Sequence, residues 1–422
     1  MRHGGDVAVS VSRLVDFLSG HAERLGAELH HGFSVRELLV RDGAVTGVRL
    51  GDVGRDRDGR PKPNYRRGET VRARITIIAD GTRGVLSTQF AGLAGGGANP
   101  QVYSLGIKAV VQFPGPSPFG SRRAVHTIGY PDPGVFGGGF VYSMGEKAAA
   151  VGLILGLDWR DGELSPQREF EAFRAHPFVA GLLRDGVAVA AGARTIPEGG
   201  YFALNRLSAA GALVAGDAAG LVNVEKLKGL HYAVRSGICA ADTAWEALER
   251  NDVGAAALAT YRDRLAARGI LDELRHARNF RQSFRWGLPA GVALSILQSH
   301  LPVRLGMAED RRATRPDGRH PRPDPGGMDA ATFVALSGSS HREDEPSHIA
   351  LIDPARCLGC SEALGAPCAH FCPGAVYRAA DGGPVLSPSN CLHCMTCMVK
   401  CPRDNIRWLP PEGGEGPRYR QL

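Results

Sequence analysis

Eight of the nine cysteines lie after residue 356, and their spacing is the strongest sign of chemistry in this chain. The last four read C-x2-C-x2-C-x3-C-P, from Cys391 through Cys394 and Cys397 to Cys401. Bacterial ferredoxins use this run, in which three thiolates hold one [4Fe–4S] cluster and the fourth binds the other cluster of a two-cluster domain. A tight loop with this spacing can wrap three corners of a cube, and the proline then turns the chain away. The run therefore predicts an iron–sulfur centre.

A second cysteine set precedes the first, with the spacing C-x2-C-x7-C-x3-C-P. Its members are Cys357, Cys360, Cys368 and Cys372. If the two runs cross as in two-cluster ferredoxins, one ligand set is Cys372 with Cys391, Cys394 and Cys397, and the other is Cys401 with Cys357, Cys360 and Cys368. The pattern thus predicts two [4Fe–4S] clusters, with a single cluster as the alternative.

Dense cysteines can also bind zinc or form disulfides. Zinc sites favour two CxxC pairs separated by a longer loop, and disulfides do not need a cysteine at every third position. Cysteines gathered at one end also differ from a disulfide scaffold spread along the chain, so a reducing compartment is favoured. Cys239 stands apart in an apolar helical segment and is interpreted as a small core residue.

The stretch LVAGDAAGLVN has a composition that suits a flavin. It places Gly216 and Asp217 at the end of an apolar strand, before small residues and a helix. In flavoproteins a carboxylate in this position hydrogen-bonds a ribityl hydroxyl, and the helix start near Gly229 and His231 can stabilise negative charge on the reduced ring. The alternative is a plain strand–turn–helix in which the aspartate caps the helix.

A weaker signal of the same kind is IIADGTRG. Asp80 and Gly81 follow another apolar strand and are assigned to the same cofactor. An ordinary β-turn accounts for this pair equally well, because Asp-Gly is common in turns.

Composition bounds the class of protein. With 422 residues, 43% hydrophobic and 22% charged, the chain has room for two or three globular domains. Its formal charge is +7, but no basic run is interleaved with aromatics, so we do not expect it to bind nucleic acid. We find no secretory h-region at the N-terminus and no run of the ~20 apolar residues that a membrane-spanning helix needs.

The elements that must position these residues follow from local patterns. We expect a helix from Ser12, as N-cap, to Gly26, and a hairpin turn at Asp42-Gly43. The β-branched and Gly-rich region 110–157 is typical of an antiparallel sheet. The charged, Pro-rich and Gly-rich region 308–328 predicts a linker.

Several longer motifs carry a family resemblance. They include GLVNVEKLKGLHYAVRSGICAA, FGGGFVYSMGEKAAAVGLILGLD, FVALSGSSHREDEPSHI and NIRWLPPEGGEGPRY. Together they closely resemble the electron-transfer flavoprotein–ubiquinone oxidoreductases, with the Fix-type relatives included. The resemblance implies FAD, an iron–sulfur centre, ubiquinone or menaquinone as substrate, and electron-transfer flavoprotein as partner. It also implies that Gly137 and Gly138 contact the quinone headgroup, where a bulge or loose turn is the alternative.

Two features depart from the family pattern. Such enzymes begin with a GxGxxG segment for the FAD pyrophosphate, and this chain contains no GxGxxG, so we expect an incomplete first dinucleotide-binding unit. The family usually carries one cluster, whose ligands match Cys372, Cys391, Cys394 and Cys397. The additional cysteines resemble a ferredoxin subunit fused to the chain.

A membrane surface is predicted at Trp286–Leu297, which is apolar for twelve residues and flanked by Arg281, Arg285 and Arg304. The segment is too short to span, and it fits a helix lying in the interface with the arginines on anionic lipid. A buried core helix is the alternative. We expect peripheral attachment to the cytoplasmic face of the inner membrane.

The expected architecture is an α/β FAD-dependent oxidoreductase-like fold with an inserted sheet-containing quinone domain and a C-terminal ferredoxin-like α+β domain. The predicted boundaries are 1–100 and 190–307 for the FAD-type domain, 101–189 for the quinone domain, 308–328 for the linker and 329–422 for the ferredoxin-like domain. The expected function is electron transfer from reduced electron-transfer flavoprotein to a membrane quinone. The alternatives are a Fix-type oxidoreductase linked to low-potential ferredoxin and a non-enzymatic iron–sulfur carrier that has lost flavin binding.

Overall fold

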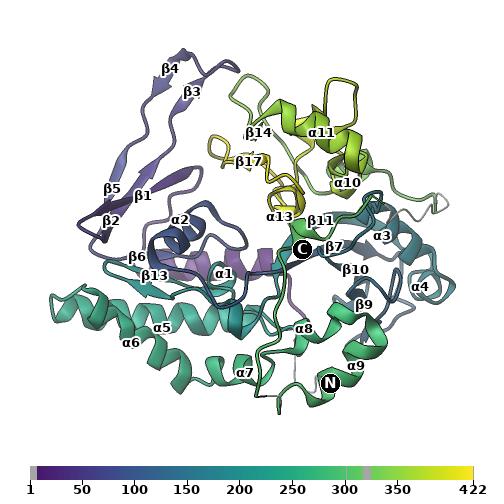
Figure 1. Ribbon diagram of the computed structural model, residues 1–422, viewed down its shortest axis with the longest axis horizontal. Helices are drawn as coiled ribbons and strands as arrows, with labels where there is room; N and C mark the ends of the chain where they lie inside the picture. The colour runs from purple at the N-terminus through teal and green to yellow at the C-terminus, as the bar shows by residue number, and fades with distance from the viewer. Residues whose placement is uncertain (1–6, 301, 317–324, 422) are drawn as a thin grey trace.

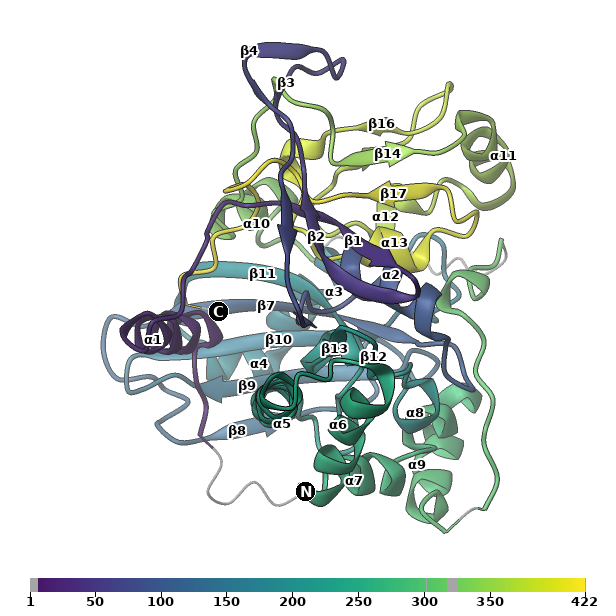
Figure 2. The same ribbon diagram turned by 90° about the vertical axis from the view of Figure 1, so that its left-hand side faces the viewer.

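Three structural units make up the computed structural model, which describes residues 7–300, 302–316 and 325–421. An α/β unit with helices α5–α7 occupies one side, a five-stranded antiparallel sheet lies beside it, and a small cysteine-bearing unit sits above the sheet (Figure 1). Figure 2 shows the same vertical order from the side, with α11 and β14 at the top and α9 at the bottom. Helices α11 and α9 therefore lie toward opposite ends of the molecule, and α12 and α13 lie between α11 and the sheet.

Helix α1 (Val11–Arg24) begins two residues earlier than an N-cap at Ser12 predicts. The side chain of Ser10 accepts a hydrogen bond from the Arg13 backbone N–H, so Ser10 is the N-cap and the assignment of Ser12 was wrong. Ser12 lies in the first turn, where its hydroxyl bonds that of Ser10 at 3.0 Å. A serine two residues earlier caps the first turn of the helix in the same way.

The first hairpin joins β1 (Val35–Arg41) and β2 (Ala44–Leu50) in antiparallel pairing. Asp42 and Gly43 adopt positive φ values of 50° and 75°, as a two-residue hairpin turn requires, which confirms the predicted turn. A second hairpin, β3 (Val53–Arg55) and β4 (Pro61–Arg66), projects from this layer.

The α/β unit is built around a short parallel pair, β6 (Thr76–Ile78) and β13 (Ala212–Val214). Strand β12 (Ser208–Ala209) pairs with β13, and β5 (Thr70–Arg72) pairs with β2. The surrounding helices are α2 (Val85–Ala94), α5 (Leu230–Glu249), α6 (Ala255–Ala267) and α7 (Ile270–His276). Cys239 is fully buried in this core beside Tyr261 and Leu213, as its apolar surroundings predicted.

The antiparallel sheet has the strand order β11-β7-β10-β9-β8. Its strands are β7 (Tyr103–Gln112), β8 (Ala124–His126), β9 (Gly137–Ser143), β10 (Ala148–Gly156) and β11 (Val187–Pro197). Helices α3 (Pro166–Ala175) and α4 (Pro177–Leu182) follow β10. Leu105, Ile107 and Leu153 are completely buried in its core, so the predicted antiparallel sheet is confirmed.

The cysteine-bearing unit is small and made of short elements. Helices α10 (Ala330–Leu336), α11 (Pro354–Leu364), α12 (Cys368–Phe371) and α13 (Thr396–Lys400) accompany the paired strands β14 (Ile349–Leu351) with β17 (Ile406–Trp408) and β15 (Tyr377–Arg378) with β16 (Val385–Leu386). The backbone N–H of Thr195 in β11 donates to the carbonyl of Cys394 at 3.0 Å. The unit is thereby fixed to the edge strand of the sheet.

The region predicted as a linker contains an anchored turn. Asp310, in the turn η4 (Asp310–Arg312), is 2% exposed and accepts a hydrogen bond from the Tyr103 N–H at 2.9 Å. Residues 317–324 of this region lie outside the described residues. The anchored turn shows that the start of the segment packs against the sheet.

Helices α8 (Phe280–Ser283) and α9 (Leu288–Leu297) follow, with the turn η3 (Phe284–Trp286) between them, and α9 lies toward the end of the molecule opposite α11. Within the described ranges, no helix combines the length and the apolar character that crossing a membrane requires.

Candidate functional site

The first ligand set is Cys372, Cys391, Cys394 and Cys397, here called the inner cysteines. Cys372 ends α12, Cys391 and Cys394 lie on the loop before α13, and Cys397 lies in the first turn of α13. Burial and then the neighbouring thiols of Cys397 and Cys394 raise the pKa of Cys391 far above its ordinary value. Burial, followed by the thiol of Cys394, likewise raises the pKa of Cys397 to about 12. Sulfurs placed this close in a buried site can all ionise only when they share a cation.

Donors surround the inner sulfurs. The N–H of Val376 donates to Sγ of Cys372 at 3.5 Å, and the N–H of His393 donates to Sγ of Cys391 at 3.4 Å. The hydroxyl oxygen of Thr396 lies 3.3 Å from Sγ of Cys394. Hydrogen bonds to the sulfurs stabilise metal-bound thiolates and set a cluster's reduction potential, so these residues fit a [4Fe–4S] cluster.

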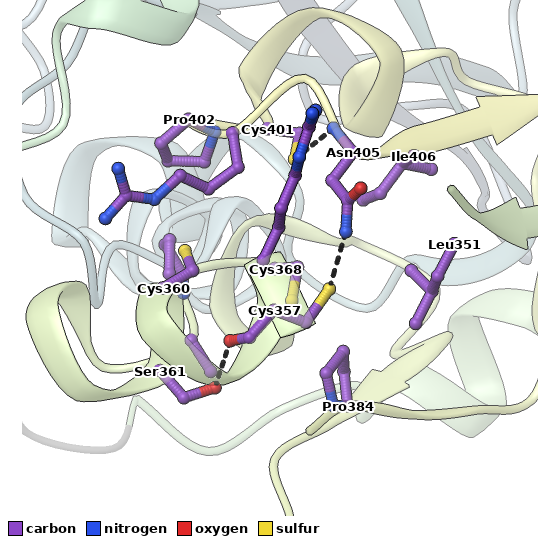
Figure 3. A pocket seen from close by; sticks show the side chains of 14 residues that line it. Leu351, Cys357, Cys360, Ser361, Cys368, Pro384, Cys401, Pro402, Asn405 and Ile406 are labelled. Carbon is purple, nitrogen blue, oxygen red and sulfur yellow. Dashed lines mark hydrogen bonds between the residues drawn. The ribbon is translucent and has the colours of Figure 1, made fainter. Parts of the chain in front are cut away.

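The second ligand set, here called the outer cysteines, lines a pocket of its own (Figure 3). Its members are Cys357, Cys360, Cys368 and Cys401. The whole pocket, which ten further residues also line, has an empty volume of about 370 Å³, including the part open to solvent. Burial and then the thiols of Cys360 and Cys401 raise the pKa of Cys368 to about 12. The structure thus brings together both crossed sets that the sequence predicted.

The predicted flavin residues gather where β6 and β13 end. These parallel strands leave the sheet side by side, so the segments that carry Asp80 and Asp217 emerge at the same edge, where α/β proteins bind their ligands. Burial raises the pKa of Asp217, and the nearby charge of Arg194 opposes that shift. A side chain at Gly229 would place its Cβ 3.6 Å from Oδ1 of Asp217, so this residue lies against the aspartate.

Asp80 has a structural task at this edge. Its Oδ2 accepts hydrogen bonds from the backbone N–H groups of Leu86 (2.8 Å) and Ser87 (3.1 Å), which stabilises the start of α2. Its Oδ1 is buried without a protein partner. Gly81 has a φ of 74°, and its Cβ position lies 3.4 Å from Nη2 of Arg194. Oδ1 of Asp80 is therefore available to a ligand, whereas Oδ2 is occupied by the start of α2.

The start of α5 holds the remaining predicted flavin residues. Gly229 is its N-cap, and His231 lies in the first turn with its ring 3.9 Å from that of Tyr232. Burial lowers the pKa of His231, which favours its neutral form. Gly216 adopts a φ of 62° and donates its N–H to Ser236 of the same helix at 3.0 Å. The turn and the helix start are thus locked together.

Arg194 and a histidine trio are features that the sequence analysis missed. Arg194 on β11 donates a hydrogen bond to the carbonyl of His393, which stands between two inner cysteines. His341, His348 and His393 place ring nitrogens within 4.8 Å of one another beside the same loop. In the sequence, these histidines stand in the motifs SHREDEPSH and CLHC. The two motifs are far apart along the chain, so neither one indicates that the three rings meet.

Gly137 and Gly138 begin β9 at the end of the sheet near α9. A Cβ at Gly137 would lie 2.0 Å from the Ile154 carbonyl oxygen, and one at Gly138 would lie 1.9 Å from that of Thr127. Close strand packing therefore requires glycine at both positions. Ile128, next to this pair, is 58% exposed.

The apolar segment next to this glycine pair is α9. The N–H of Leu288 donates to the Pro133 carbonyl at 3.0 Å, and the rings of Phe136 and Phe284 lie 5.0 Å apart. Helix α9 exposes Val292, Ile296 and Leu297, and Trp286 is exposed just before it. The buried-helix alternative is therefore wrong for most of this segment.

One of the three arginines assigned to lipid is buried. Arg281 is 2% exposed and forms ion pairs with Asp158 (Nη2–Oδ1, 2.6 Å) and Glu198 (Nε–Oε2, 3.2 Å). Its assignment to headgroups was wrong, because two carboxylates draw it inward. Arg285 and Arg304 are exposed as expected.

Two family models match the chain. The model described as "Electron transfer flavoprotein-ubiquinone oxidoreductase, 4Fe-4S" matches residues 327–420, and "ETF-QO, ubiquinone-binding" matches residues 103–196. The mitochondrial electron transfer flavoprotein-ubiquinone oxidoreductase of Arabidopsis thaliana is 36% identical over 98% of this chain and 69% of its own length. The chain belongs to the electron transfer flavoprotein–ubiquinone oxidoreductase family. The Homo sapiens member is 34% identical, over 100% of this chain and 73% of that protein.

One solved structure supports the fold of this family member. A geranylgeranyl bacteriochlorophyll reductase-like protein from Thermoplasma acidophilum is similar with a TM-score of 0.50 and 20% identity, over 68% of this chain and 64% of that one. The predicted FAD-dependent oxidoreductase-like fold, with a quinone-binding and a 4Fe–4S part, is therefore confirmed. The individual cofactor contacts and the domain boundaries stay predictions.

Proposed function

We propose that this chain passes electrons from reduced electron-transfer flavoprotein to a membrane quinone through an iron–sulfur centre and FAD. One contact carries this proposal. The inner cysteines sit directly on the sheet matched by the ubiquinone-binding model, because the Cys394 carbonyl accepts a hydrogen bond from Thr195 of β11. A cluster held there lies close to the edge where the flavin residues gather.

The flavin residues fit their cofactor. Asp217, Gly216 and Gly229 lie together at the ends of β6 and β13. The Asp217 carboxylate is available to a ribityl hydroxyl, and Gly229 next to it begins helix α5. FAD supplies the exchange between one-electron and two-electron transfer. The residues of this chain hold the cofactor and set the charge around it, with Arg194 between the flavin edge and the inner cysteines.

The quinone enters, in this proposal, from the membrane beside α9. The exposed apolar residues of α9 adjoin the segment that leads into Gly137 and Gly138, and the exposed Arg285 and Arg304 flank them. Apolar insertion with arginines at headgroup level is the usual mode of interfacial attachment. None of the nine cysteines forms a disulfide, which agrees with a reducing compartment. We therefore propose attachment to the cytoplasmic face of an inner membrane.

The test is steady-state quinone reduction by the anaerobic protein with reduced electron-transfer flavoprotein as donor. We expect turnover with this donor and a quinone in vesicles, and none when either is omitted. A visible spectrum without flavin bands would support the non-enzymatic carrier. Turnover with low-potential ferredoxin in place of quinone would support the Fix-type alternative.

A further inference from the structure

The chain follows the same path around both of its C-x3-C-P segments. Cys368 to Cys372 spans helix α12 and its end, and Cys397 to Cys401 does the same for α13. Non-glycine residues with a left-handed φ occur at matching positions in the two segments. One lies two residues before the first cysteine of each C-x3-C-P segment, and another lies three residues after the cysteine that precedes the proline. They are Ala366 (52°) and Met395 (67°) before the cysteines, and Ala375 (50°) and Asp404 (49°) after them. A non-glycine residue with positive φ is uncommon, so four at matching positions mark an internal repeat.

The hydrogen bonds to sulfur repeat as well. Four residues after Cys372, the N–H of Val376 donates to its Sγ at 3.5 Å, and four residues after Cys401, the N–H of Asn405 donates to its Sγ at 3.3 Å. A short strand follows in each copy, β15 in one and β17 in the other. Cys401 is therefore held as a ligand in the same way as Cys372.

The four outer cysteines converge on one pocket (Figure 3). Cys357 and Cys360 come from α11, Cys368 begins α12, and Cys401 ends α13. The side-chain amide of Asn405 donates to Sγ of Cys357 at 3.1 Å, so one asparagine bonds sulfurs from two different elements. This arrangement places sulfur donors on several sides of one space, with polar hydrogens directed at them.

We propose that Cys357, Cys360, Cys368 and Cys401 hold a second [4Fe–4S] cluster. In the inner set, the C-P cysteine of one repeat joins three cysteines of the other repeat. The outer set has the reciprocal composition, with Cys401 joining the three cysteines that precede Cys372. This exchange of the fourth ligand is the arrangement of two-cluster ferredoxins.

The second cluster extends the path of electrons outward. Cys397 and Cys401 lie four residues apart, at the two ends of one helical turn that rises about 6 Å, so the two ligand sets are neighbours. Helix α11 lies on the side of the unit away from β7 and β11, as both views show. Arg356 and Arg403 line the outer pocket and are exposed.

The role of the outer cluster as the point of electron entry rests on the proposed function, whereas its presence does not. A reduced flavoprotein donor gives up one electron at a time, and the outer site receives each electron and passes it to the inner site. Two such electrons, together with two protons taken up at the quinone, complete its reduction to quinol.

The first test is metal and sulfide analysis of the anaerobically purified full chain. We expect close to eight iron and eight acid-labile sulfide per chain, and close to four of each in Cys357→Ser/Cys360→Ser. Cys239→Ala, which removes the cysteine outside both sets, should keep eight. Four iron in the parent and in the double variant would overturn the proposal, as would four iron with one zinc in the parent.

The second test does not depend on the variants folding. Electron paramagnetic resonance of the dithionite-reduced parent should integrate to two spins per chain and show broadening from neighbouring clusters. One spin per chain with an unbroadened spectrum would overturn the proposal. Both readouts are independent of quinone turnover, so failure of the proposed function with two spins present would leave the second cluster standing.

Discussion

Arg194 donates a hydrogen bond from its guanidinium to the backbone carbonyl of His393, and thereby joins the flavin edge to the loop of the inner cysteines. The same guanidinium lies 3.4 Å from the Cβ position of Gly81, and its charge lowers the pKa of Asp217 against the effect of burial. One side chain thus places a positive charge between the two proposed redox centres.

Replacing Arg194 should make the inner cluster harder to reduce. Arg194→Gln keeps a hydrogen-bond donor but removes the charge that favours an added electron, so we expect the reduction potential to fall by on the order of 50 mV. A redox titration followed by electron paramagnetic resonance measures this shift. Arg262→Gln, on α6, is the matched control and should leave the potential unchanged. An unchanged potential in Arg194→Gln would mean that its charge is screened from the cluster.

Thr396 offers a second, local control of the same potential. Its hydroxyl lies 3.3 Å from Sγ of Cys394 and can donate to the metal-bound thiolate. Thr396→Val keeps the shape and removes this donor, so we expect a lower potential by tens of millivolts with unchanged iron content. Thr260→Val on the exposed face of α6 serves as the control. Loss of iron instead of a potential shift would show that the hydroxyl is needed for assembly.

Asp217 should matter for retention of FAD more than for folding. A hydrogen bond to a charged group contributes roughly 1.5–3 kcal/mol, so Asp217→Asn should weaken FAD binding by about 10- to 100-fold. Flavin content after gel filtration measures the loss. Asp242→Asn, a surface change on α5, should retain FAD at the parental level. Equal flavin in Asp217→Asn and the parent would reduce Asp217 to a residue that shapes the turn.

The membrane proposal predicts a selective loss of vesicle binding. Ile296 and Leu297 on α9 are 73% and 55% exposed, so Ile296→Asp/Leu297→Asp should fold normally, release the protein from anionic vesicles and lower quinone reduction. Trp245→Asp changes a residue that is 67% exposed on α5 and should leave binding intact. Co-sedimentation beside a thermal melt separates the cases. Equal release by both variants would mean that general charge, and not α9, controls attachment.

Asp310 predicts a pH dependence of stability. Burial and then the carboxylate of Asp158 raise the pKa of Asp310 to about 8. The fold therefore favours its protonated form, and this contribution is fully present below the ordinary aspartate pKa and lost as pH rises through about 8. Relative to Asp310→Asn, the parent should lose up to about 1.4 kcal/mol per pH unit between pH 5 and 8. Melting temperatures of both proteins across this range test it, and parallel curves would contradict it.

The cysteine sets and the Asp217 turn could be predicted because their signals are local. Ligand spacing within each C-x2-C run and the strand–turn–helix around Asp217 depend on neighbours in the sequence. Helix α1 and the Asp42-Gly43 turn followed from the same kind of signal. Both Ser10 and Ser12 could cap helix α1, and the predicted helix start was displaced because Ser10 is the residue that does so.

Contacts between distant segments could not be predicted. Arg194 and His393 are separated by 199 positions, and nothing near either residue indicates the other. Arg281 was assigned to lipid because it precedes an apolar segment, yet Asp158 and Glu198 from the sheet side bind it in the interior. Lys400 lies inside the C-x3-C spacing and is buried, with its amine donating to the Trp159 carbonyl.

The hairpin β3–β4 contacts the cysteine-bearing unit from the other end of the chain. Lys62 pairs with Asp344 at 2.8 Å, the Gly54 N–H donates to the Glu412 carboxylate at 2.7 Å, and Arg57 donates to the Glu343 carbonyl. These hairpin contacts, together with the hydrogen bond between Thr195 of β11 and Cys394, hold the cysteine-bearing unit from two sides. Hopping between the redox centres then occurs at one fixed separation, without a swinging arm. Internal electron transfer should accordingly be insensitive to solvent viscosity, and only the encounters with donor and quinone should slow in a thicker medium.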